Sequence, residues 1–339
     1  MKIVGSIEEI TKPFKNAVIT IGNFDGVHLG HQALFHEVIE KADDIDGTSV
    51  AMTFEPHPIR VLKGNGYPPL ITLYGQKAEL ISKAGLDLLI CVPFTRKFAS
   101  ITAQSFLKDI LIQKIGMKAM VVGGDYAFGK NREGNLDYLK SVSDIMGFEL
   151  IIADWIQTPL NGSARISSTR IREYVTDGHV SQAKKMLGRF YQIRGTVGQG
   201  RNRGGKLLGF PTANLTLQDE LCPKMGVYAV TVEYDGKKYK AVANIGYSPT
   251  FDDHLYTVEV HILDFQENIY GQTIRVNFIE RIRDEKNFPA LPGFPGRSGK
   301  ILPARLKLFR IFTKIFTGRP SGSISSNGFG MKRNFPALP

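Results

Sequence analysis

The first half of the chain alternates short apolar runs with segments of helical periodicity. The apolar runs predict five buried strands, at 18–21, 50–54, 88–92, 120–122 and 149–153. Apolar residues at helical spacing predict helices near 33–42, 76–84, 103–114 and 135–146. Continuous apolar strands that alternate with helices predict an α/β domain whose parallel sheet is covered on both faces. Ligands of such sheets bind beyond the carboxyl ends of the strands, so the loops after these strands are the expected site.

The pattern changes after about residue 185, where strand-like segments follow one another without helices between them. These segments lie at 192–197, 227–232, 239–243, 257–263 and 273–279. Turn signals such as Asp235-Gly236 and Tyr270-Gly271 separate them. Short strands separated by such turns predict a small antiparallel β-barrel or sandwich. The linker between the two halves, at 178–188, is expected to be helical.

Composition narrows the class of protein. The 339 residues are 42% hydrophobic and 22% charged, which excludes a wholly disordered or fibrous protein and suits two domains. No apolar stretch approaches the roughly 18 residues that cross a bilayer, and the start of the chain turns acidic before an apolar run of signal-peptide length develops. Cys91 and Cys222 are too few for a disulfide framework. We therefore expect a cytoplasmic protein without a membrane-spanning segment.

The net charge of +11 comes mainly from the C-terminal segment. Residues 288–339 contain nine Lys or Arg and no Asp or Glu, so residues 1–287 hold 34 basic against 32 acidic side chains. Because the body of the protein is nearly balanced, the charge does not indicate a nucleic-acid-binding surface, and we expect no nucleic-acid partner.

The first candidate site is the segment 22–31, Gly-Asn-Phe-Asp-Gly-Val-His-Leu-Gly-His, between the first predicted strand and its helix. Gly22 and Gly30 allow the backbone to approach a ligand, and the helix N-terminus offers free N–H groups and the positive end of the helix dipole. His28 and His31 beside that end can donate hydrogen bonds to phosphate oxygens. From the residues alone, two alternatives stay open: histidines that only cap a turn, and a zinc site, although no Cys or acidic cluster accompanies them.

This segment resembles the N-terminal module of bacterial bifunctional riboflavin kinase/FAD synthetases, which are nucleotidylyltransferases with a His-x-Gly-His motif. Three further segments resemble the same family in the expected order: Phe-Glu-Pro-His-Pro at 54–58, Gly-Asp-Tyr-Ala-Phe-Gly at 124–129 and Ile-Ser-Ser-Thr-Arg-Ile-Arg at 166–172. The resemblance implies a Rossmann-like nucleotidylyltransferase domain over residues 1–184. In that domain the phosphate of FMN would attack the α-phosphorus of ATP, giving FAD and pyrophosphate.

The resemblance also implies roles for single residues. His28 and His31 would be catalytic and hold the ATP phosphates and the developing charge. The ATP-binding residues would be Gly22, Asn23, Gly30, Asp125, Ser167, Ser168, Thr169 and Arg172. Phe54, Pro56 and Phe128 would supply apolar surface for the isoalloxazine ring. Taken singly, Phe54 and Phe128 are equally consistent with core residues, and Ser167 with a helix cap.

The second candidate site lies in the barrel half, where a glycine-rich basic loop at 198–206 leads to Gly-Phe-Pro-Thr-Ala-Asn at 209–214. Glycines interleaved with Lys and Arg are typical of a loop that surrounds phosphates, although a solvated hairpin has the same composition. The Gly-Lys-Ser/Thr ending of a Walker A loop is absent. Phe-Pro-Thr-Ala-Asn resembles the riboflavin kinase signature, which implies an antiparallel riboflavin kinase β-barrel over residues 185–288.

In that resemblance Thr212 and Asn214 bind Mg²⁺ with the nucleotide, and Gly205 and Lys206 contact the ATP phosphates. Thr212 and Asn214 carry hard oxygen ligands two residues apart, so on a strand they face the same side. Glu259 stands between two valines that point to the other face. The resemblance assigns it to accept the proton of the ribityl 5′-hydroxyl. From the pattern alone, Glu259 is equally an exposed strand carboxylate.

The resemblance ends near residue 288, where relatives continue with a polar helix that packs on the barrel near the flavin pocket. Here 289–296 is rich in Pro and Gly, and the hexapeptide at 287–292 recurs at 334–339. Residues 302–316 have an apolar face and a basic face. Such a segment is consistent with membrane binding, with a substitute for the missing helix, or with an altered reading frame. We expect 289–339 to be an atypical, partly disordered tail.

The expected function is therefore FAD biosynthesis from riboflavin, with ATP as co-substrate of both steps and Mg²⁺ as cofactor. Riboflavin, FMN and ATP are the expected partners. One alternative is an FAD synthetase whose kinase module is impaired by its C-terminus. Another is a non-enzymatic flavin- or nucleotide-binding scaffold that the basic helix tethers.

Overall fold

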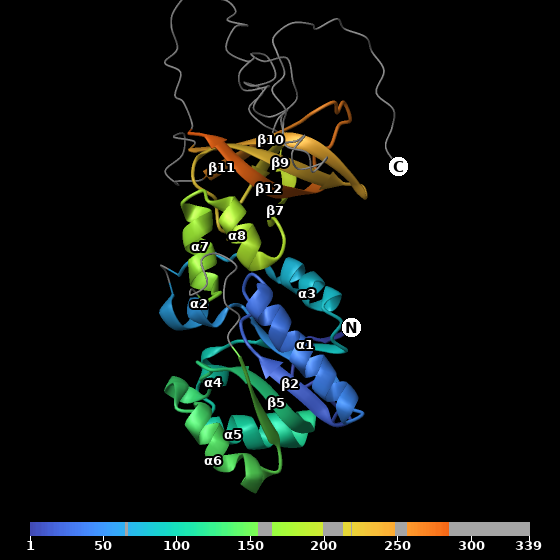
Figure 1. Cartoon of the computed structure of the whole chain (residues 1–339), viewed down its shortest axis with the longest axis vertical. Helices are drawn as coiled ribbons and strands as arrows, with labels where there is room; N and C mark the ends of the chain where they lie inside the picture. Colours follow the sequence, from blue (N-terminus) through green and yellow to red (C-terminus); the bar gives the residue numbers. More distant parts are fainter. Residues whose placement is uncertain (65–66, 155–164, 199–212, 218, 248–255, 285–339) are drawn as a thin grey trace, which may run out of the picture. The chain divides into compact units, whose positions relative to one another are not determined.

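The computed structural model describes residues 1–64, 67–154, 165–198, 213–217, 219–247 and 256–284 (Figure 1). Three residues assigned from the sequence, Gly205, Lys206 and Thr212, lie outside these ranges. The segment 289–339 also lies outside them.

Six parallel strands form one sheet in the order β1-β4-β3-β2-β5-β6. Their bounds are β1 (Lys2–Val4), β2 (Ala17–Ile21), β3 (Ser49–Glu55), β4 (Leu88–Pro93), β5 (Met117–Gly123) and β6 (Glu149–Ala153). The five strands predicted from apolar runs are confirmed. Strand β1 was not predicted, because three residues carry too little periodicity to be recognised.

Helices connect these strands and continue beyond the last one. They are α1 (Leu29–Asp44), α2 (Pro58–Lys63), α3 (Tyr74–Lys83), α4 (Arg96–Ala99), α5 (Ala103–Ser105), the π-helix η1 (Phe106–Ile115), the 3₁₀-helix η2 (Lys130–Arg132), α6 (Leu136–Met146), α7 (Ser168–Thr176) and α8 (Val180–Leu187). The predicted helix at 103–114 is thus a short α-helix followed by a π-helix. The linker predicted to be helical contains α8. No helix within the described ranges is long and apolar enough to span a membrane.

Both faces of the sheet are covered by helices, as the strand pattern predicts. Successive side chains of a strand point to opposite faces. In β2, Val18 packs in one hydrophobic cluster with Val38 of α1, whereas Ile19 packs in another with Leu111 of η1. The sheet is therefore the middle layer of three, and its carboxyl edge is left for a site.

The second half is a closed antiparallel barrel in the order β10-β11-β8-β7-β12-β9 (Figure 1). Its strands are β7 (Tyr191–Gly198), β8 (Ala213–Thr216), β9 (Gly226–Tyr234), β10 (Lys237–Tyr247), β11 (Tyr256–Ile262) and β12 (Thr273–Arg283). Inward-facing residues such as Val230, Ile245, Val258 and Val276 are fully buried. A closed barrel, one of the two architectures predicted, has no unpaired edge strand.

Candidate active sites

A cavity of about 720 Å³ lies at the carboxyl edge of the parallel sheet. It is bordered by residues at or just after the ends of five strands: Ile21, Phe54, Phe94, Gly123 and Ala153. This is the edge at which parallel-sheet proteins bind their ligands.

The residues of the first half that were assigned to the nucleotide and the flavin line this cavity, with one exception. Those that line it are Gly22, Asn23, His28, Gly30, His31, Phe54, Asp125, Phe128, Ser167, Ser168, Thr169 and Arg172. Pro56 is exposed and is not among the lining residues, whereas its neighbours His57 and Pro58 are. The chain turns between β3 and α2 at Pro56, and this turn carries the proline ring to the surface.

His28 and His31 stack against each other at the N-terminus of α1. Their ring centroids are 3.6 Å apart, with 17° between the planes. His28 is the N-cap residue, and its Nδ1 accepts the backbone N–H of His31 at 3.3 Å. Because Nδ1 of the neutral ring accepts, the proton of His28 lies on Nε2, which makes Nε2 the donor. The turn-capping alternative is thus part of the arrangement. Among the described residues, no group of three or more His, Cys, Asp and Glu could hold a zinc ion.

Burial keeps both imidazoles uncharged near neutral pH. It lowers the pKa of His28 to about 4 and lowers the pKa of His31 well below its ordinary value. The charges of Arg165 and Arg189 near His28, and of Lys77 near His31, act in the same direction. Both rings are therefore neutral hydrogen-bond donors at a helix N-terminus, an arrangement that suits negative charge building up on a phosphate.

The turn that carries the histidines has a strained backbone. Phe24 and Val27 have φ angles of 47° and 38°, in the left-handed region that costs a non-glycine residue roughly 1–3 kcal/mol. A Cβ atom at Gly22 would lie 2.8 Å from the Phe24 ring, so this position requires glycine. The Gly26 N–H is held by Thr72 Oγ1 at 3.0 Å. The surrounding structure thus imposes the shape of this turn.

Asp25 is a residue of the same turn to which the sequence analysis gave no role. Its side chain is only 4% exposed and accepts hydrogen bonds from Arg172 at 2.5 Å, from the Thr72 N–H at 3.0 Å and from the Ile71 N–H at 3.2 Å. Arg172 also donates from Nε to the Pro69 carbonyl oxygen at 3.0 Å. Arg172 therefore lines the cavity while two of its donors bind the protein itself.

The start of α7 closes another side of the cavity. Ser167 is its N-cap and accepts a backbone N–H of the first turn at 3.3 Å, so the helix-cap alternative is confirmed for this residue. The Ser168 hydroxyl donates to the Asp25 carbonyl oxygen at 2.8 Å. Asp125, which also lines the cavity, accepts a hydrogen bond from Arg165 at 2.7 Å. Hydroxyls, a carboxylate and guanidinium groups are thus brought together on this side.

A row of aromatic rings forms the apolar wall of the cavity. The ring centroid of Phe54 lies 5.5 Å from that of Phe94 and 5.9 Å from that of Phe98. The ring centroid of Phe106 lies 5.9 Å from that of Phe98 and 5.8 Å from that of Phe128. Phe128 is 8% exposed and packs in the core, which confirms the core interpretation. It also lines the cavity, and its contact with the isoalloxazine ring stays a prediction. Phe94 and Phe98 were not predicted from the sequence, although they follow directly after a predicted strand.

The barrel carries a row of polar side chains on its outer surface. Glu259 of β11 is exposed and is the register partner of Asn214 in β8 and of Asn244 in β10. Val258 and Val260 beside it are fully buried, which confirms the predicted alternation. Asn244 was not predicted from the sequence, because its position opposite Glu259 depends on strand register.

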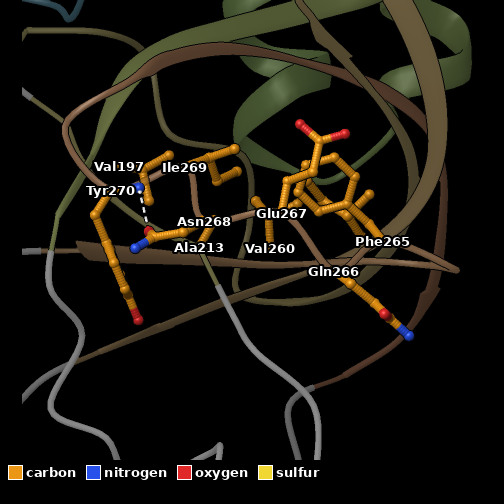
Figure 2. A pocket seen from close by; sticks show the side chains of 10 residues that line it. Val197, Ala213, Val260, Phe265, Gln266, Glu267, Asn268, Ile269 and Tyr270 are labelled. Atoms are coloured by element: carbon orange, nitrogen blue, oxygen red, sulfur yellow. Dashed lines mark hydrogen bonds between the residues drawn. The ribbon is translucent and has the colours of Figure 1, made fainter.

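A second cavity, of about 180 Å³, lies at one end of the barrel (Figure 2). Its wall is made largely of apolar side chains, including Val197, Ala213, Val260 and Phe265. The segment 265–270 closes it, and there the Tyr270 N–H donates to Asn268 Oδ1 at 3.1 Å (Figure 2). Ala213 and Val260 are the chain neighbours of Asn214 and Glu259, so the cavity and the polar row share two strands.

Comparison with known proteins gives matches to both halves of the chain. Residues 10–170 match the FAD synthetase family, and residues 187–293 match the riboflavin kinase family. The bifunctional riboflavin kinase/FMN adenylyltransferase of Escherichia coli strain K12 is 37% identical over 293 residues, which cover 86% of this chain and 92% of that protein. The protein of the same name from Buchnera aphidicola subsp. Acyrthosiphon pisum is 36% identical with the same coverage.

The same architecture occurs in a crystal structure of a macrolide-efflux protein from Streptococcus pneumoniae. It is 35% identical, has a TM-score of 0.76, and the match covers 90% of this chain and 96% of that one. With both halves matched in the order of the bifunctional relatives, the chain belongs to the bifunctional riboflavin kinase/FMN adenylyltransferase family, and it phosphorylates riboflavin to FMN and adenylylates FMN to FAD with ATP.

Proposed function

We propose that FMN and ATP react in the cavity of the parallel sheet, and that riboflavin is phosphorylated on the barrel beside Glu259. The observation that carries the first assignment is the stacked pair of neutral imidazoles, His28 and His31, at the N-terminus of α1 inside a cavity of about 720 Å³. A cavity of this size suits two ligands that meet at their phosphates.

In the first site, an FMN phosphate oxygen forms a bond to the α-phosphorus of ATP. The bond from that phosphorus to the α–β bridging oxygen breaks, and pyrophosphate leaves. His28 and His31 donate hydrogen bonds to the phosphate oxygens on which negative charge accumulates during this step. Gly22, Asn23 and Gly30, with the first turn of α7 at 167–169, surround the phosphates, and the aromatic wall holds the isoalloxazine ring.

In the second site, the riboflavin 5′-hydroxyl oxygen attacks the γ-phosphorus of ATP, and ADP leaves. Glu259 accepts the hydroxyl proton, because its exposed carboxylate stands at the centre of the polar row with Asn214 and Asn244. The apolar cavity at the end of the barrel is lined by the inner face of the same two strands, so it is separate from the outer face that carries Glu259.

We propose that Mg²⁺ binds with ATP at Thr212 and Asn214. Asn214 is half-buried opposite Glu259, and its amide oxygen is a hard ligand of the kind that Mg²⁺ prefers. The described residues contain no cluster of three or more acidic, His or Cys side chains, so this ion would take most of its remaining ligands from phosphate and water. When bound, the ion neutralises phosphate charge.

We further propose the division into a transferase domain at 1–184 and a kinase domain at 185–288. The limits of the two family matches support this division. We also propose that the protein is located in the cytoplasm. The two cysteines support this location, since both Cys91 and Cys222 are free thiols.

Single substitutions test the two-site assignment. His28→Ala or His31→Ala should lower FAD formation from FMN by about 100- to 1,000-fold, with FMN formation from riboflavin changed by less than about two-fold. Glu259→Gln should lower FMN formation from riboflavin, while FAD formation from FMN changes little. Chromatographic separation of riboflavin, FMN and FAD measures both steps in one sample.

His36→Ala is the matched control, because His36 lies on α1 with a side chain that is 72% exposed. It should leave both reactions unchanged. If one histidine substitution in the site stopped both reactions in a folded protein, the two-site assignment would be wrong.

A further inference from the structure

Lys77 is a buried lysine that neither the motifs nor the cavity lining account for. It lies on α3 and is only 4% exposed. Its Nζ donates to Thr53 Oγ1 at 3.1 Å and to the Asn23 carbonyl oxygen at 3.3 Å. The ammonium therefore sits directly behind the turn that carries Gly22 and Asn23 into the cavity.

Stability does not explain a lysine at this place. The two oxygens that the ammonium contacts directly are neutral, and burying a charge is unfavourable. Burial lowers the pKa of Lys77, and the nearby Glu55, Cys91 and Asp25 offset this shift only in part. The Asn23 carbonyl oxygen has a hydrogen-bond partner even without the lysine, because the Thr53 hydroxyl donates to it at 3.3 Å. An apolar side chain of similar length would fill the same space at a lower desolvation cost.

What the lysine supplies is a positive charge under the phosphate turn and a second donor that holds the Asn23 carbonyl group. A cation in a low-dielectric interior attracts a polyphosphate more strongly than a solvated one does. Since Lys77 does not line the cavity, it acts through Asn23 and Gly22. A turn held from behind keeps its ligand-facing side in one position, as outer partners do for metal ligands.

We propose that Lys77 is a positioning residue for adenylyl transfer, which fixes the Gly22–Asn23 turn for the ATP phosphates through the Asn23 carbonyl oxygen. This inference rests on the proposed place of ATP in the sheet cavity.

The test measures FAD formation from FMN with the full-length Lys77→Met variant. We expect kcat/KM for ATP to fall by about 10- to 100-fold, with the KM for FMN and the phosphorylation of riboflavin unchanged. Lys77→Gln keeps a donor without the charge, so its loss of kcat/KM for ATP should be smaller than that of Lys77→Met. Lys83→Met is the matched control on the same helix, because the Lys83 side chain is 67% exposed, and it should behave as the wild type.

Three results would overturn the inference. The first is a Lys77→Met variant within about three-fold of the wild type in FAD formation. The second is a rise in the KM for FMN that parallels the loss toward ATP, which would indicate that Lys77 supports the whole cavity. The third is an unfolded N-terminal half, because the lysine would then be needed for stability. His28→Ala, assayed in parallel, separates this question from the site itself: if it retains FAD formation, the proposed site is wrong whatever Lys77 does.

Discussion

Arg172 donates a hydrogen bond of 2.5 Å to the buried carboxylate of Asp25, and the two residues lie 147 positions apart in the chain. Asp25 belongs to the turn after the first long strand of the sheet, whereas Arg172 belongs to the helix after the last strand. The pair therefore joins the two segments that contribute the histidines and the hydroxyl groups of the cavity.

Removing the cation of this pair should destabilise the N-terminal half. Arg172→Met leaves a buried carboxylate without its charge partner, which typically costs about 3–5 kcal/mol. We expect a lower unfolding temperature and slower FAD formation, measured by calorimetry and by chromatography. The double variant with Asp25→Asn should recover part of the stability, because the buried charge is then gone, but not the activity. A single variant that unfolds at the wild-type temperature would contradict this prediction.

Acidification should destabilise the protein through its buried histidines. The pKa of His28 is about 4 and that of His31 lies well below its ordinary value, whereas both are near 6.5 in the unfolded chain. Between pH 6.5 and about 4 the unfolded chain therefore binds protons that the folded chain does not, so stability falls as pH falls through this window. Each such histidine contributes up to about 1.4 kcal/mol per pH unit.

Thermal unfolding at pH 7 and pH 5 measures this effect. His31→Gln should weaken the pH dependence, and His36→Gln, at the exposed position on the same helix, should leave it unchanged. An equal pH dependence in all three proteins would show that other groups cause it.

Replacing Tyr126 with Phe should stabilise the protein. The Tyr126 hydroxyl is buried, and it has no hydrogen-bond partner among the described residues, while its ring stacks on Phe128 at 5.5 Å. A buried polar group without a partner costs roughly 1–3 kcal/mol, so Tyr126→Phe should raise the free energy of unfolding by an amount in this range. Chemical denaturation measures the change.

Tyr191→Phe is the opposite control. The Tyr191 hydroxyl is also buried, but it donates to the Leu221 carbonyl oxygen, so its loss should lower stability. If Tyr126→Phe lowered stability as much as Tyr191→Phe, the Tyr126 hydroxyl would have a partner after all.

The C-terminal segment should affect only the kinase step. Replacing everything after Phe288 with the polar helix that the family resemblance implies should strengthen riboflavin binding and raise kinase turnover. The reason is that, as the family resemblance implies, such a helix would cover apolar barrel surface beside the place of the flavin. FAD formation from FMN should change little. A kinase indifferent both to this replacement and to removal of residues 289–339 would show that the segment is neither harmful nor needed.

Local sequence was enough to predict the α/β class of the first half, the antiparallel β class of the second half, and the loops that border the cavity. Buried strands and helices leave different periods in the sequence, and motifs such as 22–31 occupy the short loops after strands, which a parallel sheet gathers at one edge. Five of the six strands in each half could therefore be predicted without coordinates, although the pattern of the second half left a barrel and a sandwich open. The two histidines were candidates from the residues alone, whereas the hydroxyl groups of the cavity came from the family resemblance. The alternation around Glu259 followed in the same way, from the two-residue period of a strand.

The tertiary structure decided what depends on residues far apart in the chain. No local pattern pairs Asp25 with Arg172, places Lys77 behind Asn23, or sets Asn244 opposite Glu259. The tertiary structure also places Pro56 at the surface, outside the cavity, and places Phe94 and Phe98 in the cavity lining. Periodicity reports only which face of its own element a residue occupies. Which charge a buried residue meets is set by the packing of elements against each other, and that packing determines the pKa values and hydrogen bonds on which the chemistry depends.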